Sequence, residues 1–274
     1  MERSNFYRLI DLPPQIIEAL EAAGRETDLQ RLSPQLDGMM DIETAQAACR
    51  RLRELLSDDP DGFKMLYCHL ECARRAYDGY RQRGIPDQVY TDTMRCFSRF
   101  LRESHRERGR MVFDRAWWSY RQTSMALFRL GALEYEFSSH EGAPALALHI
   151  PSDADFSPAA VDDSLARARR FFQTYFPDFR CGEWTCDSWL LSPALRPLLY
   201  PDSHILSFQD RFRVQRENPD DREFIQWLFQ VPQNTPADRL PAETSLQNSV
   251  RELLLRGGTV GCAYGVMKAN CPAL

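Results

Sequence analysis

The chain has almost no lysine: only Lys64 and Lys268 stand among its 34 basic residues, and the others are arginines. A Schiff-base or phosphate-binding lysine therefore has only two candidates. Three common site motifs are also missing, namely G-x-x-x-x-G-K-[S/T], G-x-G-x-x-G and H-E-x-x-H. The sequence thus gives no support to a P-loop, a dinucleotide-binding fingerprint or a zinc-protease helix.

Long apolar runs and a strong positive charge are missing as well. No stretch approaches the ~20 apolar residues of a membrane helix, and the start, MERSNFYRLIDLPP, lacks the apolar centre of a signal peptide. The formal net charge of −5 argues against a general nucleic-acid or anionic-membrane binder. We expect a cytoplasmic protein with neither kind of partner, and the sequence leaves its oligomeric state open.

The cysteines are scattered along a large chain and are not concentrated in a small domain. This usage is typical of free, mostly buried thiols in a reducing compartment. Cys68, His69 and Cys72 resemble half of a zinc site, but no second ligand pair follows at a suitable spacing. We therefore expect no metal. The eight cysteines are Cys49, Cys68, Cys72, Cys96, Cys181, Cys186, Cys262 and Cys271.

The first half of the chain has a helical period. The clearest stripe is Phe63, Leu66, Leu70, Ala73, Tyr77 and Tyr80, at alternating spacings of three and four. Four further helices are predicted, over residues 14–24, 41–56, 87–101 and 110–130. The last should bury Phe113, Trp117, Tyr120, Leu127 and Phe128.

The period changes near residue 131. Residues 133–137 and 145–150 flank the turn-forming SSHEGAP and predict a β-hairpin, and Ser157-Pro158 starts an amphipathic helix. Strands are predicted over 184–191, 204–214 and 258–267, with helices over 223–229 and 245–256. We predict an α+β protein with a helical N-terminal domain over 1–131 and a mixed α/β domain over 132–274.

Five blocks in a set order give a more specific indication: FRLGALEYEF, LHIPSDADFSPAAVDDSLARARRFF, CDSWLLSPAL, SHILSFQDRF and GGTVGCAYG. Together they resemble a bacterial two-domain acyltransferase-like family. That resemblance implies an N-terminal helical bundle followed by a GNAT-like domain with a central, mostly antiparallel sheet. It also implies acyl-CoA or acetyl-CoA as co-substrate and a small-molecule acyl acceptor with an amine or hydroxyl group.

The resemblance also suggests where the co-substrate binds. In the general GNAT pattern, the loop after the fourth strand holds the CoA pyrophosphate at a helix N-terminus. The corresponding loop here is 151–157, with Ser152, Ala154, Phe156 and Ser157 as candidate cofactor contacts. This loop has no glycine and carries two aspartates, whose charge opposes a pyrophosphate. Ser157 has an alternative role as an ordinary helix cap.

Four residues are candidates for the chemistry. His149, before the loop, has the type of side chain that acts as a base near neutral pH, or it is a structural histidine. Cys186 is a possible nucleophile or a buried thiol. In GNAT-type chemistry the amine attacks the thioester directly, and a tyrosine often protonates the thiolate. By that resemblance Tyr200 is the nearest match. Tyr264 is a second candidate because small residues surround it in GCAYG, and packing is the alternative role for both.

Three hypotheses follow from these residues. The first is an acyl-CoA-dependent acyltransferase. The second is a GNAT-type scaffold that no longer catalyses and acts as a binding or sensing module, which the glycine-free acidic loop favours. The third is a partner-binding protein that uses the arginine-rich run 99–121, although ion pairs within the helices are the alternative for that run.

Overall fold

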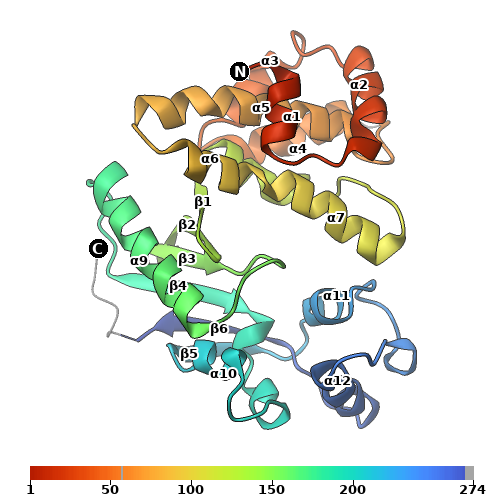
Figure 1. Cartoon of the computed structure of the whole chain (residues 1–274), viewed down its shortest axis with the longest axis vertical. Coiled ribbons are helices and arrows are strands. Elements are labelled where there is room, and N and C mark those ends of the chain that lie inside the picture. The colour runs from red at the N-terminus through yellow and green to blue at the C-terminus, as the bar shows by residue number, and fades with distance from the viewer. Residues whose placement is uncertain (57, 269–274) are drawn as a thin grey trace. The chain divides into compact units, whose positions relative to one another are not determined.

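The computed structural model describes residues 1–56 and 58–268 and divides into two compact units between Arg129 and Leu130 (Figure 1). The helices of the first unit are α1 (Arg3–Leu9), α2 (Ile17–Glu26), α3 (Ser33–Gly38), α4 (Ala45–Leu55), α5 (Phe63–Gln82), α6 (Asp87–Met94), α7 (Cys96–Arg108) and α8 (Ala116–Thr123). Two of them, α1 and α3, were not predicted from the sequence.

Helix α5 is the centre of the first unit and contacts α2, α3, α6 and α8. Its predicted stripe is confirmed, because Leu66 and Tyr80 are fully buried. Gly62, just before the helix, has a φ of 73°, and a Cβ there would lie 2.1 Å from the carbonyl oxygen of Phe113. Only glycine fits this position, since it tolerates both the left-handed backbone and the close approach.

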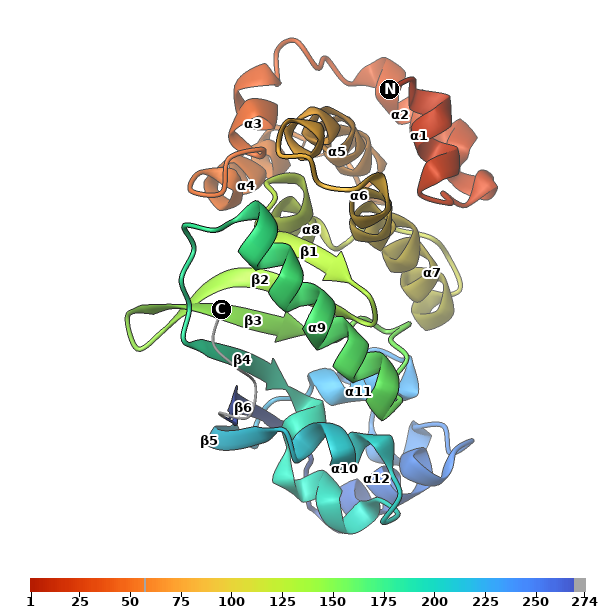
Figure 2. The ribbon, with the colours of Figure 1, turned by 60° about the vertical axis from the view of Figure 1, so that its left-hand side comes forward.

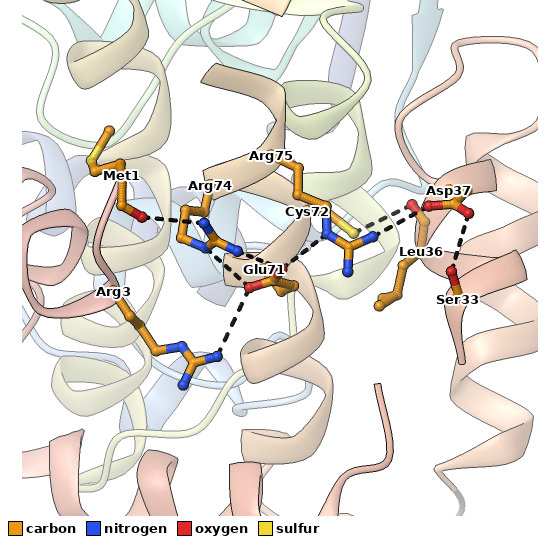
Figure 3. Close-up of polar contacts among 9 residues, drawn as sticks. All are labelled: Met1, Arg3, Ser33, Leu36, Asp37, Glu71, Cys72, Arg74 and Arg75. Atoms are coloured by element: carbon orange, nitrogen blue, oxygen red, sulfur yellow. Dashed lines mark hydrogen bonds and ion pairs between the residues drawn. The ribbon is translucent and has the colours of Figure 1, made fainter. Parts of the chain in front are cut away.

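A network around Glu71 ties the N-terminal segments to α5 (Figure 3). Arg74 and Arg75 donate to Oε1 of Glu71 at 2.8 and 2.9 Å, and Arg3 of α1 lies 3.9 Å from Oε2. Arg75 also donates to Asp37 of α3 at 3.2 Å. Burial raises the pKa of Glu71, but the hydrogen bonds from Arg74 and Arg75 outweigh it and hold the pKa below its usual value. The network around this buried carboxylate thus links α1 to α5 through Arg3, and α3 to α5 through Arg75 and Asp37.

The predicted helix over 110–130 is wrong at both ends. Helix α8 covers only Ala116–Thr123, Met125 has a left-handed φ of 55°, and β1 (Leu127–Leu130) follows as a strand. Trp117 is 48% exposed and does not belong to the core. The predicted helix over 87–101 is two helices, α6 and α7, which meet at Arg95.

The second unit is built on a sheet. Besides β1, the strands of this sheet are β2 (Leu133–His140), β3 (Ala143–His149), β4 (Glu183–Ser188), β5 (Phe212–Asn218) and β6 (Cys262–Met267). Their order across the sheet is β1-β2-β3-β4-β6-β5. Strands β3 and β4 are parallel, while the pairs β2–β3, β4–β6 and β5–β6 are antiparallel. This confirms the predicted α+β class with a mostly antiparallel sheet, and it confirms the hairpin of β2 and β3.

Helix α9 (Pro158–Tyr175) connects β3 to β4 and crosses one face of the sheet (Figure 2). Ser164 at its centre donates to the carbonyl of Leu130 at 2.5 Å, so Tyr135 must donate to the Ser164 oxygen, 2.9 Å away. Next to them the rings of Phe137 and Phe172 meet edge to face at 5.3 Å. Aromatic packing around one buried serine therefore fixes α9 on this face.

The remaining helices are α10 (His204–Gln209), α11 (Glu223–Phe229) and α12 (Ser245–Leu255). The predicted strand over 204–214 is thus wrong in its first half, because Ser203 accepts a hydrogen bond from the Ile205 amide and starts a helix. The strand predicted over 184–191 ends at Ser188. Helices α11 and α12 share an apolar cluster that includes Phe224, Ile225 and Val250.

Candidate functional site

The pairing of the strands determines which candidate residues share a face of the sheet. Ala147 pairs with Thr185, and Thr185 pairs with Val266. His149 lies two residues after Ala147 on β3, and Tyr264 lies two residues before Val266 on β6. Because side chains alternate along a strand, all five point to one face. His149 and Tyr264 therefore share a face, which we call the polar face.

Cys186 points to the other face. It pairs with Leu148, which alternates with the polar-face residue His149 on β3, and α9 covers that side of the sheet. The side chain is 1% exposed, and burial raises the pKa of its thiol. A protonated, inaccessible thiol is a poor nucleophile. Among the two roles considered for Cys186, the structure favours the buried structural thiol.

The His149 imidazole is held by a carboxylate on the neighbouring strand. Its Nε2 lies 2.8 Å from Oε2 of Glu136. His149 pairs with Glu134 and Ala147 pairs with Glu136, so His149 and Glu136 are diagonal neighbours across the β2–β3 hairpin. Both side chains are about one-fifth exposed, at 23% and 19%. A carboxylate that fixes one imidazole nitrogen orients the ring and supports the histidine as a base.

Tyr264 makes a second contact of this kind. Its hydroxyl lies 2.7 Å from Nδ1 of His140, at the end of β2, and the two rings stack at 5.5 Å. The other nitrogen of His140, Nε2, lies 3.5 Å from Oε2 of Glu183, the first residue of β4. The His140 side chain is only 11% exposed, whereas Glu183 is 46% exposed. Tyr264, His140 and Glu183 thus form a chain of contacts that ends at a side chain exposed to solvent.

Further charged groups surround Tyr264. The Arg216 guanidinium lies 5.3 Å from the centre of the Tyr264 ring, and it also lies 3.9 Å from Asp187. Cys262 donates to Asp187 at 3.0 Å. Burial, and then this hydrogen bond, raise the pKa of the Cys262 thiol. Cys262 therefore stays protonated and acts here as a donor.

Tyr200 lies apart from these groups. It follows the 3₁₀ helix Pro193–Leu198, in the loop before α10, and it is 69% exposed. Its backbone carbonyl accepts a hydrogen bond from Ser203 at 3.0 Å. Of the four predicted catalytic candidates, His149 and Tyr264 share one face of the sheet, Cys186 lies on the other face, and Tyr200 lies outside the sheet.

The loop 151–157 already carries an anionic group at the N-terminus of α9. Asp155 accepts a hydrogen bond from the Ser157 amide at 2.9 Å, and this bond lowers the pKa of Asp155. Ser157 in turn caps the helix, since its Oγ accepts from the Ala160 amide at 3.4 Å. The predicted helix-cap role of Ser157 is confirmed. A pyrophosphate at this helix end would lie beside the Asp155 carboxylate, which already accepts from the Ser157 amide.

The other loop residues are held by local contacts. The Ala154 amide donates to the Pro151 carbonyl at 3.0 Å and closes a turn. The Phe156 ring packs against Phe208 of α10, with ring centres 4.8 Å apart. Ser152 is exposed. A preformed turn with a packed aromatic ring gives the loop a defined shape in front of α9.

The arginine-rich run is largely neutralised by acidic side chains. Arg102 pairs with Asp11 at 2.6 Å, Arg108 pairs with Asp114 at 2.7 Å, and Arg110 pairs with Asp61. Across residues 1–56 and 58–268, no group of three or more His, Cys, Asp or Glu side chains is arranged to hold a metal ion. No helix in the same residues is long and apolar enough to cross a membrane.

Comparison with known proteins places this geometry in a family. Residues 127–267 match the model of the GNAT-like C-terminal domain, and residues 1–125 match the model of the N-acyltransferase N-terminal domain. The chain belongs to this GNAT-like family. The predicted resemblance is therefore confirmed, and with it the class of an N-acyltransferase. No curated protein matches the sequence.

Solved structures of acyltransferases match over nearly the whole chain. One, a complex with decanoyl-CoA and teicoplanin, is 26% identical with a TM-score of 0.80, over 97% of this chain and 87% of that one. A second, in complex with decanoyl-CoA, is 21% identical with a TM-score of 0.71, over 97% of this chain and 99% of that one. At 21% identity, this second structure shows a similarity of fold alone.

Three polar-face residues were missed by sequence reasoning: Glu136, His140 and Glu183. The alternation in LEYEFSSH does place Glu136 and His140 on one side of a strand, opposite Tyr135 and Phe137. What the sequence does not contain is the partner of each residue, since His140 and Tyr264 are 124 positions apart.

Proposed function

We propose that the chain transfers a medium-length acyl group from acyl-CoA to an amine of a small-molecule acceptor. The main support is the full-length similarity, at 26% identity, to an acyltransferase in complex with decanoyl-CoA and teicoplanin. The N-terminal model of N-acyltransferases favours an amine over a hydroxyl as acceptor. A donor of about ten carbons is the first choice, and the free thiols support a reducing, cytoplasmic location.

His149 is the candidate general base in this proposal. The amine must lose a proton as it attacks the thioester carbonyl, and a positioned imidazole accepts such a proton near neutral pH. Glu136, 2.8 Å away, would orient the ring and stabilise the imidazolium. No covalent intermediate is needed, so Cys186 has a structural role.

The donor would bind with its pyrophosphate at the N-terminus of α9. Helix N-termini favour anions, and the Asp155 carboxylate already accepts a hydrogen bond from the Ser157 amide just before this one. On binding, the pyrophosphate would replace Asp155, with Ser152, Ala154 and Ser157 as contacts. Phe156 would keep the loop in place through Phe208.

A binding module without catalysis is the second candidate. Asp155 favours it, because a carboxylate bonded to the Ser157 amide repels the donor phosphates. Such a protein would bind acyl-CoA weakly and release no thiol.

The experiment is a transfer assay with decanoyl-CoA. Teicoplanin and simple primary amines serve as acceptors, thiol release reports turnover, and mass spectrometry identifies the decanoylated product. We expect acceptor-dependent thiol release and a product heavier by one decanoyl group. Binding of decanoyl-CoA without thiol release, with every acceptor, would favour the binding module.

A further inference from the structure

Asp187 lies beside the candidate base on the polar face. Strands β3 and β4 are parallel neighbours (Figure 2), and Leu148 pairs with Cys186. One step further along both strands, His149 therefore lies opposite Asp187. Neighbouring strands run about 5 Å apart, and residues that face each other across them point to the same side of the sheet. The Asp187 carboxylate is thus a neighbour of the His149 imidazole.

Asp187 differs from the other carboxylates near His149 in its access to solvent. Glu134, which pairs with His149 on β2, is 2% exposed. Glu136 lies 2.8 Å from the imidazole Nε2 and is 19% exposed. Asp187 is 58% exposed. A molecule that approaches His149 from solution can therefore contact the carboxylate of Asp187, whereas Glu134 is covered.

The Asp187 carboxylate is held in place and can still accept hydrogen bonds. The Cys262 thiol donates to its Oδ1 at 3.0 Å, and the Arg216 guanidinium lies 3.9 Å from its Oδ2. Arg216 is 72% exposed and also lies 5.3 Å from the centre of the Tyr264 ring. An ammonium group binds a carboxylate at about 2.8 Å, and each carboxylate oxygen has two lone pairs. The looser contact with Arg216 leaves room for such a bond.

We propose that Asp187 binds the ammonium group of the acyl acceptor and presents its nitrogen to His149. This inference rests on the proposed function and specifies the class of acceptor, a primary amine that is protonated in solution. Simple alkylamines resemble the lysine side chain, whose pKa is about 10.4, so they reach the protein as cations. A carboxylate attracts such a cation, whereas a neutral hydroxyl compound of the same shape has no charge for it to attract.

The step balances without any further reactant. The bound ammonium carries three protons, and the amide product keeps one of them. One proton passes to the His149 imidazole, which frees the lone pair of the nitrogen. The nitrogen then bonds to the thioester carbon, the C–S bond breaks with its electron pair on sulfur, and the second proton ends on that sulfur to give the CoA thiol. His149 returns its proton to water.

The first test is the binding of hexylamine and 1-hexanol to the whole chain, measured by isothermal titration calorimetry. The two compounds share an alkyl chain and differ in their charge. We expect the wild type to bind hexylamine about tenfold more tightly than hexanol. Asp187→Asn keeps an oxygen for the Cys262 thiol but has no charge, so it should bind both compounds equally. Asp187→Glu keeps the charge and should retain a preference for hexylamine.

Kinetics of decanoyl transfer to hexylamine test the same residue during turnover. Asp187→Asn should raise the KM for hexylamine about tenfold and leave the KM for decanoyl-CoA unchanged. Arg216→Gln removes a competing cation and should lower the KM for hexylamine. Asp178→Asn, at an exposed position beyond the end of α9, is the control and should match the wild type. Circular dichroism and thermal unfolding show that each variant is folded, and Asp187→Ser replaces Asp187→Asn if the latter is not.

The outcomes separate the two claims. Equal affinities of the wild type for hexylamine and hexanol, or no measurable binding of either, would overturn the role of Asp187. A preference for hexylamine that the folded Asp187→Asn variant retains, or an unchanged KM for hexylamine in that variant, would also overturn it. A wild type that prefers hexylamine in binding but releases no thiol with any acceptor would overturn the proposed function, while the ammonium site at Asp187 would stand.

Discussion

The Tyr264 hydroxyl and Nδ1 of His140 lie 2.7 Å apart, although 124 positions separate the two residues in the chain. The contact joins the tip of the β2–β3 hairpin to β6, the last strand in the chain. Beneath it, Ala145 and Thr185 on the polar face are almost fully buried. Their short side chains leave room for two stacked rings to cross the sheet.

His149 should be needed for proton removal from the acceptor. We expect His149→Gln to reduce kcat/KM for the amine about 100-fold or more, since loss of a positioned base costs roughly 10²- to 10⁴-fold. Glu136→Gln should cause a smaller loss, because it weakens the orientation of the ring but leaves it in place. The measurement is the rate of thiol release against amine concentration. His105→Gln is the matched control, and a His149→Gln enzyme as fast as this control would exclude the role.

Asp155 should weaken donor binding. Removing its charge eliminates the repulsion toward two phosphate charges and weakens the competition for the Ser157 amide. We therefore expect Asp155→Asn to bind decanoyl-CoA about tenfold more tightly. Isothermal titration calorimetry measures the affinity. Asp178→Asn, the same charge change just beyond the other end of the 18-residue helix, should have little effect. Equal affinities for the wild type and both variants would mean that the pyrophosphate binds elsewhere.

The amount that could be predicted from the sequence depends on how local the signal is. The β2–β3 hairpin and the cap of α9 are specified by neighbouring residues, Glu141-Gly142 at the turn and Ser157-Pro158 at the helix start. The strand at Leu127 was missed, because its apolar residues continue the spacing of the preceding helix. The left-handed Met125 that separates the two has no clear sequence signal.

The candidate site shows the same limit. His149 and Tyr264 could be named from their positions in two strands, but a sheet brings them to one face only through the pairing of β3, β4 and β6. For Cys186 the sequence left two roles open, a nucleophile or a buried thiol, and the fold favours the buried thiol. Its register partner Leu148 places it under α9.

Cys186 should not form an acyl-enzyme. We expect Cys186→Ala to keep kcat within about threefold of the wild type while it loses some stability, as buried substitutions usually do, by about 0.5–3 kcal/mol. Intact-mass spectrometry after incubation with decanoyl-CoA should show no added decanoyl group. A decanoyl adduct that appears in the wild type and is absent from Cys186→Ala would contradict the direct-attack mechanism.

His69 in the first unit should make stability depend on pH. It is fully buried among Ser119, Cys49 and Phe113, and burial lowers its pKa from 6.5 to about 3. Between about pH 3 and pH 6.5, the unfolded chain therefore binds a proton that the folded chain does not bind. The stability of the fold consequently decreases as the pH falls below 6.5. Between about pH 7.5 and about pH 5, this one group should lower the free energy of unfolding by about 2 kcal/mol.

Urea unfolding at both pH values measures this effect. The fall in unfolding free energy should be about 2 kcal/mol smaller in His69→Gln than in the wild type. His105→Gln, at an exposed position, is the control and should fall as the wild type does. An equal fall in all three proteins would show that His69 accepts a proton in the folded state.

The most direct test of acyl-CoA use is thermal unfolding with CoA, acetyl-CoA and decanoyl-CoA, because it requires no acceptor. A ligand at about 100 times its dissociation constant stabilises the folded protein by about 2.7 kcal/mol. We predict a clear rise in Tm that is largest with decanoyl-CoA and larger still in Asp155→Asn. No rise in Tm with any of the three, at high micromolar concentration, would contradict an acyl-CoA-dependent transferase.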